Sequence, residues 1–115
     1  MAEVHTAQER ARTLADPASF ATVSDDAARK VLRAYLSSGS LPVIPRAGVK
    51  RRVLLDRLSS AFEPGVRYSE REVNETVRTW NPDVAALRRY LVEEGLLDRD
   101  HGEYWRCGGS VDLSR

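Results

Sequence analysis

A run of three cations is the first feature of this sequence that could do chemistry. Lys50, Arg51 and Arg52 lie at the start of an expected helix. Cations at that end oppose the positive end of the helix dipole, which suggests a purpose other than helix stability. One interpretation is a patch that contacts phosphate groups. The alternative is a solvated helix end that pairs with acidic residues elsewhere in the chain.

A second group of candidate phosphate contacts lies further along the chain. Arg89 could reach a guanine or a phosphate, Tyr90 could reach a phosphate, and the small Ala85 would let a nucleic-acid backbone approach closely. Arg99 and Arg106 flank an expected hairpin, and hairpins of this kind often meet the minor groove or the DNA backbone. The alternative for the hairpin is a solvated loop whose acidic neighbours neutralise it.

Ion pairs are the alternative interpretation for the arginines of this second group. Arg88 falls within the apolar stripe of its helix, so a structural role is the more natural one for it. The acidic residues that could pair with Arg88 or Arg89, and so lock the helices together, are Glu72, Glu75, Glu93 and Asp98.

Motifs for catalysis or metal binding are missing from the sequence. There is no glycine-rich phosphate loop, nucleophile elbow or paired metal-ligand motif. His101 and Cys107 match no zinc spacing, and Trp80, Tyr104 and Trp105 are better explained as packing than as a ligand cage. We therefore expect a protein that is not an enzyme, with no catalytic residue, metal or cofactor.

Length and charge limit the choice of function further. The chain has 115 residues, enough for one domain, and its net charge is +1 from 18 basic and 17 acidic residues. This near-balance argues against strong non-specific DNA binding. The sequence shows no signal peptide and no apolar run of roughly 20 residues, and it has one cysteine. We therefore expect a cytoplasmic protein without membrane contact.

Two helices are expected before the cationic run. Residues 1–23 form an N-terminal arm that is partly helical: Thr6 and Glu9 fit a capping box for a helix over residues 3–15, which Asp16-Pro17 ends. A stronger helix is predicted from Ser24, as N-cap, to about Ser37. Residues 41–45 contain two prolines and are expected to form an extended edge segment.

From residue 50 the capping and turn signals predict a helix-turn-helix and a hairpin. A helix over 50–62 comes first. Ser69 and Glu72 then form a capping box for a helix to about Thr79, with Tyr68 and Val73 as hydrophobic staple. A third helix is predicted from residue 81, with an asparagine cap followed by proline, and Gly95 ends it. Residues 96–99 and 103–106 form the hairpin.

This order predicts a fold that is mainly α with a small β-hairpin: a winged helix-turn-helix preceded by one or two N-terminal helices. The expected divisions are the arm at 1–23, the winged-helix domain with its lead-in helix at 24–107, and a flexible tail at 108–115.

The same residues carry a resemblance to a known family. The runs Tyr68–Glu75, Asp83–Arg99 and Gly102–Arg106 resemble the bacterial family called domain of unknown function 2087, and the resemblance extends over roughly residues 28–106. Its most specific part is Leu-Arg-Arg-x-Leu followed by Gly-Leu-Leu. Members often carry His where this chain has Asn81. The family implies a winged-helix-like domain associated with bacterial transcriptional regulators, with no catalytic residues to carry over.

The leading hypothesis is therefore a DNA-binding protein of bacterial transcriptional regulation. Its third helix would enter the major groove, and Lys50, Arg51, Arg52, Arg99 and Arg106 would hold phosphates. A homodimer is expected because one domain buries little DNA surface, with the N-terminal arm or the helix from Ser24 as the dimer element. The alternative is a winged-helix module that binds protein or dimerises without DNA, which the near-neutral charge favours.

Overall fold

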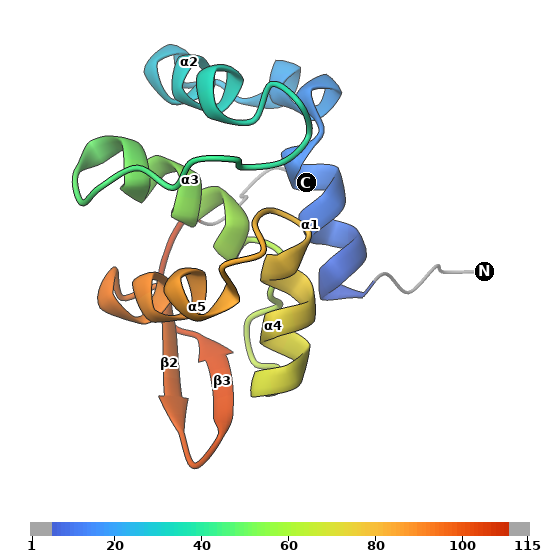
Figure 1. Ribbon diagram of the computed structural model, residues 1–115, viewed down its shortest axis with the longest axis vertical. Helices are drawn as coiled ribbons and strands as arrows, with labels where there is room; N and C mark the ends of the chain where they lie inside the picture. Colours follow the sequence, from blue (N-terminus) through green and yellow to red (C-terminus); the bar gives the residue numbers. More distant parts are fainter. Residues whose placement is uncertain (1–5, 111–115) are drawn as a thin grey trace.

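The computed structural model describes residues 6–110 of the chain. Seven of its elements follow the predicted order, and Figure 1 shows three N-terminal helical segments beside a second group that ends in a β-hairpin. The N-terminal segments are α1 (Ala7–Ala15), the 3₁₀ helix η1 (Pro17–Thr22) and α2 (Asp26–Tyr35). None of the helices within residues 6–110 combines the length and the apolar character that a bilayer-spanning segment needs.

Side-chain caps fix where the N-terminal helices begin. The Thr6 hydroxyl accepts a hydrogen bond from the Glu9 N–H at 3.1 Å, as predicted, while the expected residues 3–5 of this helix lie outside the described residues. The cap of α2 is Asp25, one residue after the predicted Ser24, because its carboxylate accepts from the N–H groups of Ala27 and Ala28. An acidic cap at this end also complements the helix dipole.

The second group contains α3 (Val49–Ser59), α4 (Glu70–Arg78) and α5 (Val84–Glu93). The predicted capping box of α4 is present with both of its hydrogen bonds: Ser69 accepts from the Glu72 N–H, and Glu72 accepts from the Ser69 N–H. Helix α3 is shorter than the predicted helix over 50–62, because residues 60–62 form turns and a bend after Ser59. Phe62 is nevertheless fully buried, as its place on the apolar stripe requires.

The start of α5 differs from the prediction. Its cap is Asp83, whose carboxylate accepts from the Ala86 N–H, and not Asn81. The Asn81 side chain instead accepts from the Asp83 N–H at 2.8 Å and donates to the Leu41 carbonyl at 2.7 Å. The helix therefore begins two residues later than predicted, with Asp83 as its N-cap. Leu41 is buried, and the segment 41–45 is irregular and forms no strand.

A small antiparallel sheet closes this group. It consists of β1 (Tyr68–Ser69), β2 (Leu97–Asp100) and β3 (Glu103–Arg106) in the order β1-β3-β2. The hairpin turns at His101 and Gly102, whose φ angles of 50° and 78° are both positive, as a two-residue turn of this twist requires. β1 has no counterpart among the predicted elements, and it extends the hairpin to a sheet of three strands.

The core is continuous across both groups. The Trp80 indole N–H donates to the Ala11 carbonyl at 2.7 Å, and the Arg57 guanidinium donates to the Leu14 carbonyl at 3.1 Å and to Ser19 Oγ at 2.8 Å. Burial lowers the pKa of Arg57. The N-terminal helices thus share one core with α3 and α4. Among the largest fully buried side chains are Phe20, Leu32, Leu36, Leu54, Phe62, Trp80, Leu87 and Tyr104.

Candidate nucleic-acid interface

We call the hairpin of β2 and β3 the wing. A hollow of about 290 Å³ lies between α5 and the wing. Its lining residues are Ala85, Arg88, Arg89, Val92, Arg99 and Tyr104. The first four are spaced i, i+3, i+4 and i+7 along α5, which places them on one helix face. Arg99 and Tyr104 are directly paired across β2 and β3, so both side chains point to the same side of the wing. Helix periodicity and strand pairing together bring three guanidinium groups to one hollow.

Arg88 is held by α4. Its Nε lies 3.7 Å from Glu70 Oε1, and its guanidinium donates to the Asn74 side-chain oxygen. Only 20% of the Arg88 side chain is exposed. The Tyr104 hydroxyl also donates to Glu70 Oε1, at 3.3 Å. Glu70 therefore forms an ion pair with Arg88 of α5 and accepts a hydrogen bond from Tyr104 of the wing.

Arg89 and Arg99 are more accessible than Arg88. Arg89 has an exposed side chain, with a long contact of 3.9 Å to Glu93 on its own helix. Arg99 is exposed on β2, and no acidic partner for its guanidinium is found within residues 6–110. Its positive charge is thus the least compensated of the three at the hollow.

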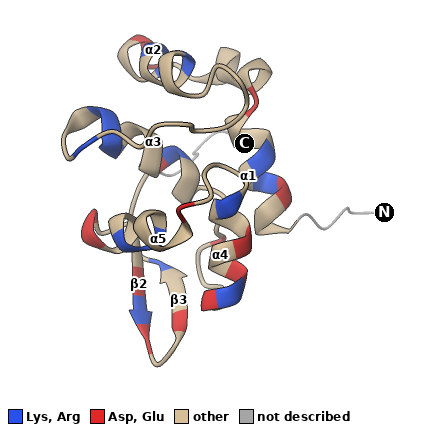
Figure 2. Cartoon of the chain, viewed as in Figure 1, with Lys and Arg blue, Asp and Glu red and all other residues tan. Residues whose placement is uncertain are grey.

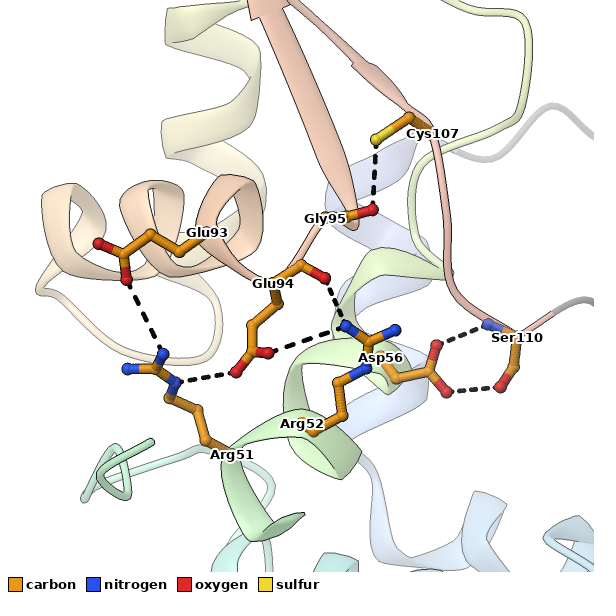
Figure 3. A network of polar contacts seen from close by, with 8 residues as sticks. All are labelled: Arg51, Arg52, Asp56, Glu93, Glu94, Gly95, Cys107 and Ser110. Atoms are coloured by element: carbon orange, nitrogen blue, oxygen red, sulfur yellow. Dashed lines mark hydrogen bonds and ion pairs between the residues drawn. The ribbon is translucent and has the colours of Figure 1, made fainter. Parts of the chain in front are cut away.

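Tyr90 and Arg51 form a different contact, on the side of α5 that faces α3. The Arg51 guanidinium lies over the Tyr90 ring at 4.2 Å from its centre, and Arg89 lies 5.0 Å from that centre. Arg51 Nε is 3.2 Å from Glu94, and another of its nitrogens is 3.8 Å from Glu93 (Figure 3). Arg51 is therefore engaged with the C-terminal end of α5.

Arg52 and Lys50 lie beside this contact. Arg52 donates to the Glu94 carbonyl and lies 3.8 Å from its carboxylate. Cations suit this position because α5 ends there, with its negative dipole end and its last free carbonyls. Lys50 is exposed, with its Nζ 6.0 Å from the Tyr35 ring centre. The cationic run that opposes the dipole of α3 thus complements the dipole of α5.

Arg106 lies at the base of the wing, away from the hollow. Its guanidinium donates to the carbonyls of Gly108 and Ser110. Ser110 in turn donates from its N–H and its hydroxyl to the Asp56 carboxylate, each at 2.6 Å (Figure 3). These hydrogen bonds link Ser110, in the segment predicted to be a flexible tail, to α3. Residues 111–115 of that segment lie outside the described residues.

Cys107 is the one cysteine of the chain and lies where this tail begins. Its thiol is within 3.3 Å of the Gly95 carbonyl. Burial and the nearby negative charge of Asp98 raise the pKa of the thiol. Within residues 6–110, no three His, Cys, Asp or Glu side chains gather as a metal ion would require.

The structure therefore divides the predicted site residues. It brings Ala85, Arg89 and Arg99 together at the hollow and places Lys50, Arg51, Arg52, Tyr90 and Arg106 elsewhere. The sequence predicts a packing role for Arg88, which in the structure also lines the hollow. Its spacing of three residues from Ala85 and four from Val92 was a signal that could have shown it.

Charge over this part of the molecule is mixed. Between Glu70 and Arg106 the sequence has nine acidic and six basic side chains. Figure 2 shows both signs on α4, on α5 and on the wing. The hollow is thus a local concentration of positive charge within a surface that is acidic on average.

The element order α3-β1-α4-α5-β2-β3, with α4 and α5 as the helix pair, is compatible with a winged-helix-like arrangement, and it carries an arginine-lined hollow. Residues 40–106 match the family model described as "Uncharacterized protein conserved in bacteria (DUF2087)". This is more than half of the chain, and the protein belongs to that family. No curated protein and no solved structure matches the chain.

Proposed function

We propose that the protein binds double-stranded DNA in bacterial transcriptional regulation, with α5 in the major groove and the wing against the phosphate backbone. The observation that carries the proposal is the hollow, where Arg88 and Arg89 of α5 meet Arg99 of the wing. In winged-helix-like domains the second helix of the helix-turn-helix is the element that fits a major groove. The exposed Ala85 and Arg89 lie on the face of α5 that would approach the bases.

Two copies on one DNA site fit this proposal best. A single small domain buries too little DNA surface for tight specific binding. The half-buried Val31 and Tyr35 on α2 are candidates for the dimer contact, whereas Leu36 is buried within the chain. Sedimentation of Tyr35→Glu beside the unaltered protein tests this contact.

Fluorescence anisotropy of labelled duplex DNA across a salt series tests the main proposal. We expect the logarithm of the association constant to fall by about 0.9 for each phosphate neutralised, per tenfold rise in salt. Arg89→Ala should weaken binding by about 1–3 kcal/mol and relax the base preference. Arg33→Ala, which removes an exposed arginine from α2, is the matched control. Equal affinities of the two variants would refute the role of Arg89.

A second candidate function is protein binding without DNA. It is favoured by the excess of acidic over basic residues between Glu70 and Arg106, since acidic surfaces repel phosphate. This candidate predicts no anisotropy change with any duplex, even at low salt. If the protein binds duplex DNA at low salt and Arg89→Ala abolishes this binding, a function without DNA is excluded.

A further inference from the structure

We infer that the hollow between α5 and the wing is a binding site for a single phosphate group, and that Glu70 is its internal competitor. The inference deepens the proposed function and rests on it for the source of the phosphate, a diester of the DNA backbone. A phosphate on a small free molecule has the same chemistry, and the experiment below distinguishes the two sources.

The lining of the hollow has the donors that a phosphate requires. Guanidinium groups bind phosphate oxygens through paired N–H donors, and three of them line this one hollow. Two come from a helix and one from a strand, so the donors approach from two sides. A hollow of about 290 Å³ has room for a phosphate group with its first waters.

The apolar part of the lining strengthens the attraction between a bound anion and the arginines. Ala85 and Val92 supply apolar side chains, and the Tyr104 ring is buried behind them. Such walls lower the local dielectric constant and strengthen the attraction between opposite charges. The same walls make an uncompensated arginine unfavourable, which explains why a carboxylate reaches toward the hollow.

Glu70 supplies that carboxylate. Its Oε1 atom is 3.7 Å from Arg88 Nε and 3.3 Å from the Tyr104 hydroxyl. About half of the Glu70 side chain is exposed, so it can move into solvent when another anion binds. An incoming phosphate would take over Arg88 and would be repelled by the carboxylate that remains nearby. Removing this charge should therefore strengthen binding.

Glu70→Gln is the variant that tests the competitor, because glutamine keeps the size and the acceptor oxygen for Tyr104. For charges roughly 6 Å apart at an effective dielectric constant of about 40 to 80, as in an open and solvated hollow, we expect phosphate to bind about threefold to tenfold more tightly. Glu75→Gln is the matched control: it removes the same charge from the same helix, but Glu75 pairs with Arg71, whereas Glu70 contacts the lining residues Arg88 and Tyr104. Arg99→Gln should weaken phosphate binding by at least about fivefold.

The first measurement titrates inorganic phosphate into the full chain, with chloride at equal ionic strength as reference. NMR signals of the arginine Nε–H groups report the binding. The inference predicts saturable shifts for Arg88, Arg89 and Arg99, none for Arg33, and the variant order given above. Shifts spread over all arginines, or equal affinities of Glu70→Gln and Glu75→Gln, would overturn it.

The second measurement repeats the variants with duplex DNA and separates this inference from the proposed function. If the duplex binds but neither Glu70→Gln nor Arg99→Gln alters its affinity, the site is wrong and DNA binding stands. If phosphate binds at the hollow but no duplex binds at low salt, the site stands with a small phosphorylated molecule as its ligand, and the proposed function is wrong. If Glu70→Gln and Arg99→Gln change the affinities for inorganic phosphate and for duplex DNA in the same direction, the natural ligand is a phosphate diester of DNA.

Discussion

Arg51→Met tests whether the cation that stacks on Tyr90 holds α5 in place. Methionine keeps most of the length and apolar stem of the side chain and removes the charge. The Arg51 side chain is 11% exposed and that of Glu94 is 18% exposed, so the variant leaves a shielded carboxylate without its nearest cation. Such losses are larger than those of exposed surface pairs.

The magnitude follows from the two contacts that disappear. A guanidinium over an aromatic ring contributes about 0.5–2 kcal/mol, and a hydrogen bond to a charged group contributes about 1.5–3 kcal/mol. The two are not additive, and part of the gain is offset by the desolvation of both charges. We expect the free energy of unfolding to fall by about 2–3 kcal/mol. For a domain of this size, that lowers Tm by about 8–12 °C.

Urea denaturation followed by circular dichroism measures this change. Lys50→Met is the matched control, because the neighbouring Lys50 is exposed and has only a 6.0 Å contact to the Tyr35 ring; we expect it to cost less than about 0.5 kcal/mol. A double-mutant cycle with Glu94→Gln should give a coupling energy above about 1 kcal/mol. If Arg51→Met proves as mild as Lys50→Met, Arg51 does not anchor α5 and is available for a phosphate.

Three further predictions concern the shared core, the helix cap and the thiol. Trp80→Phe removes the indole donor to the Ala11 carbonyl and leaves a cavity, so the free energy of unfolding measured in urea should fall by about 2–4 kcal/mol, with hydrogen exchange accelerated in α1. Ser69→Ala removes the cap of α4 and should cost about 1 kcal/mol in the same assay, whereas Ser69→Asp should restore most of it. Asp98→Asn removes a negative charge that raises the pKa of the Cys107 thiol, so the thiol pKa should fall. At a fixed, mildly alkaline pH the thiolate fraction should then rise, and alkylation of Cys107 by iodoacetamide should accelerate. An unchanged alkylation rate would contradict this account.

Local signals predicted the fold well because several of them act within a few residues. The capping box at Ser69 and Glu72 needs only four consecutive positions, and it is present with both hydrogen bonds. Gly95 ends α5 with a φ of 73°, as predicted from its residue type. Where two capping residues competed, as at Asn81 and Asp83, sequence alone could not decide. The amide group of Asn81 also donates to the Leu41 carbonyl, forty residues away, and no local pattern indicates this contact.

The candidate site was harder to predict because its charges are arranged by tertiary structure. Arg51 and Arg99 are both arginines beside expected elements, yet one is engaged with α5 and the other lies at the hollow. Their difference depends on which helix end or strand each one meets. The strand β1 is only two residues long and its pairing with β3 is distant in sequence, so no periodic pattern could reveal it.

Ser69 gives the wing a mechanical connection to the helix pair. Its hydroxyl begins α4, and its backbone lies opposite Glu103 in the sheet. Because β3 is the middle strand, a tilt of the hairpin moves the residue on which the first turn of α4 depends. A ligand that draws the wing toward α5 should therefore also perturb the first turn of α4.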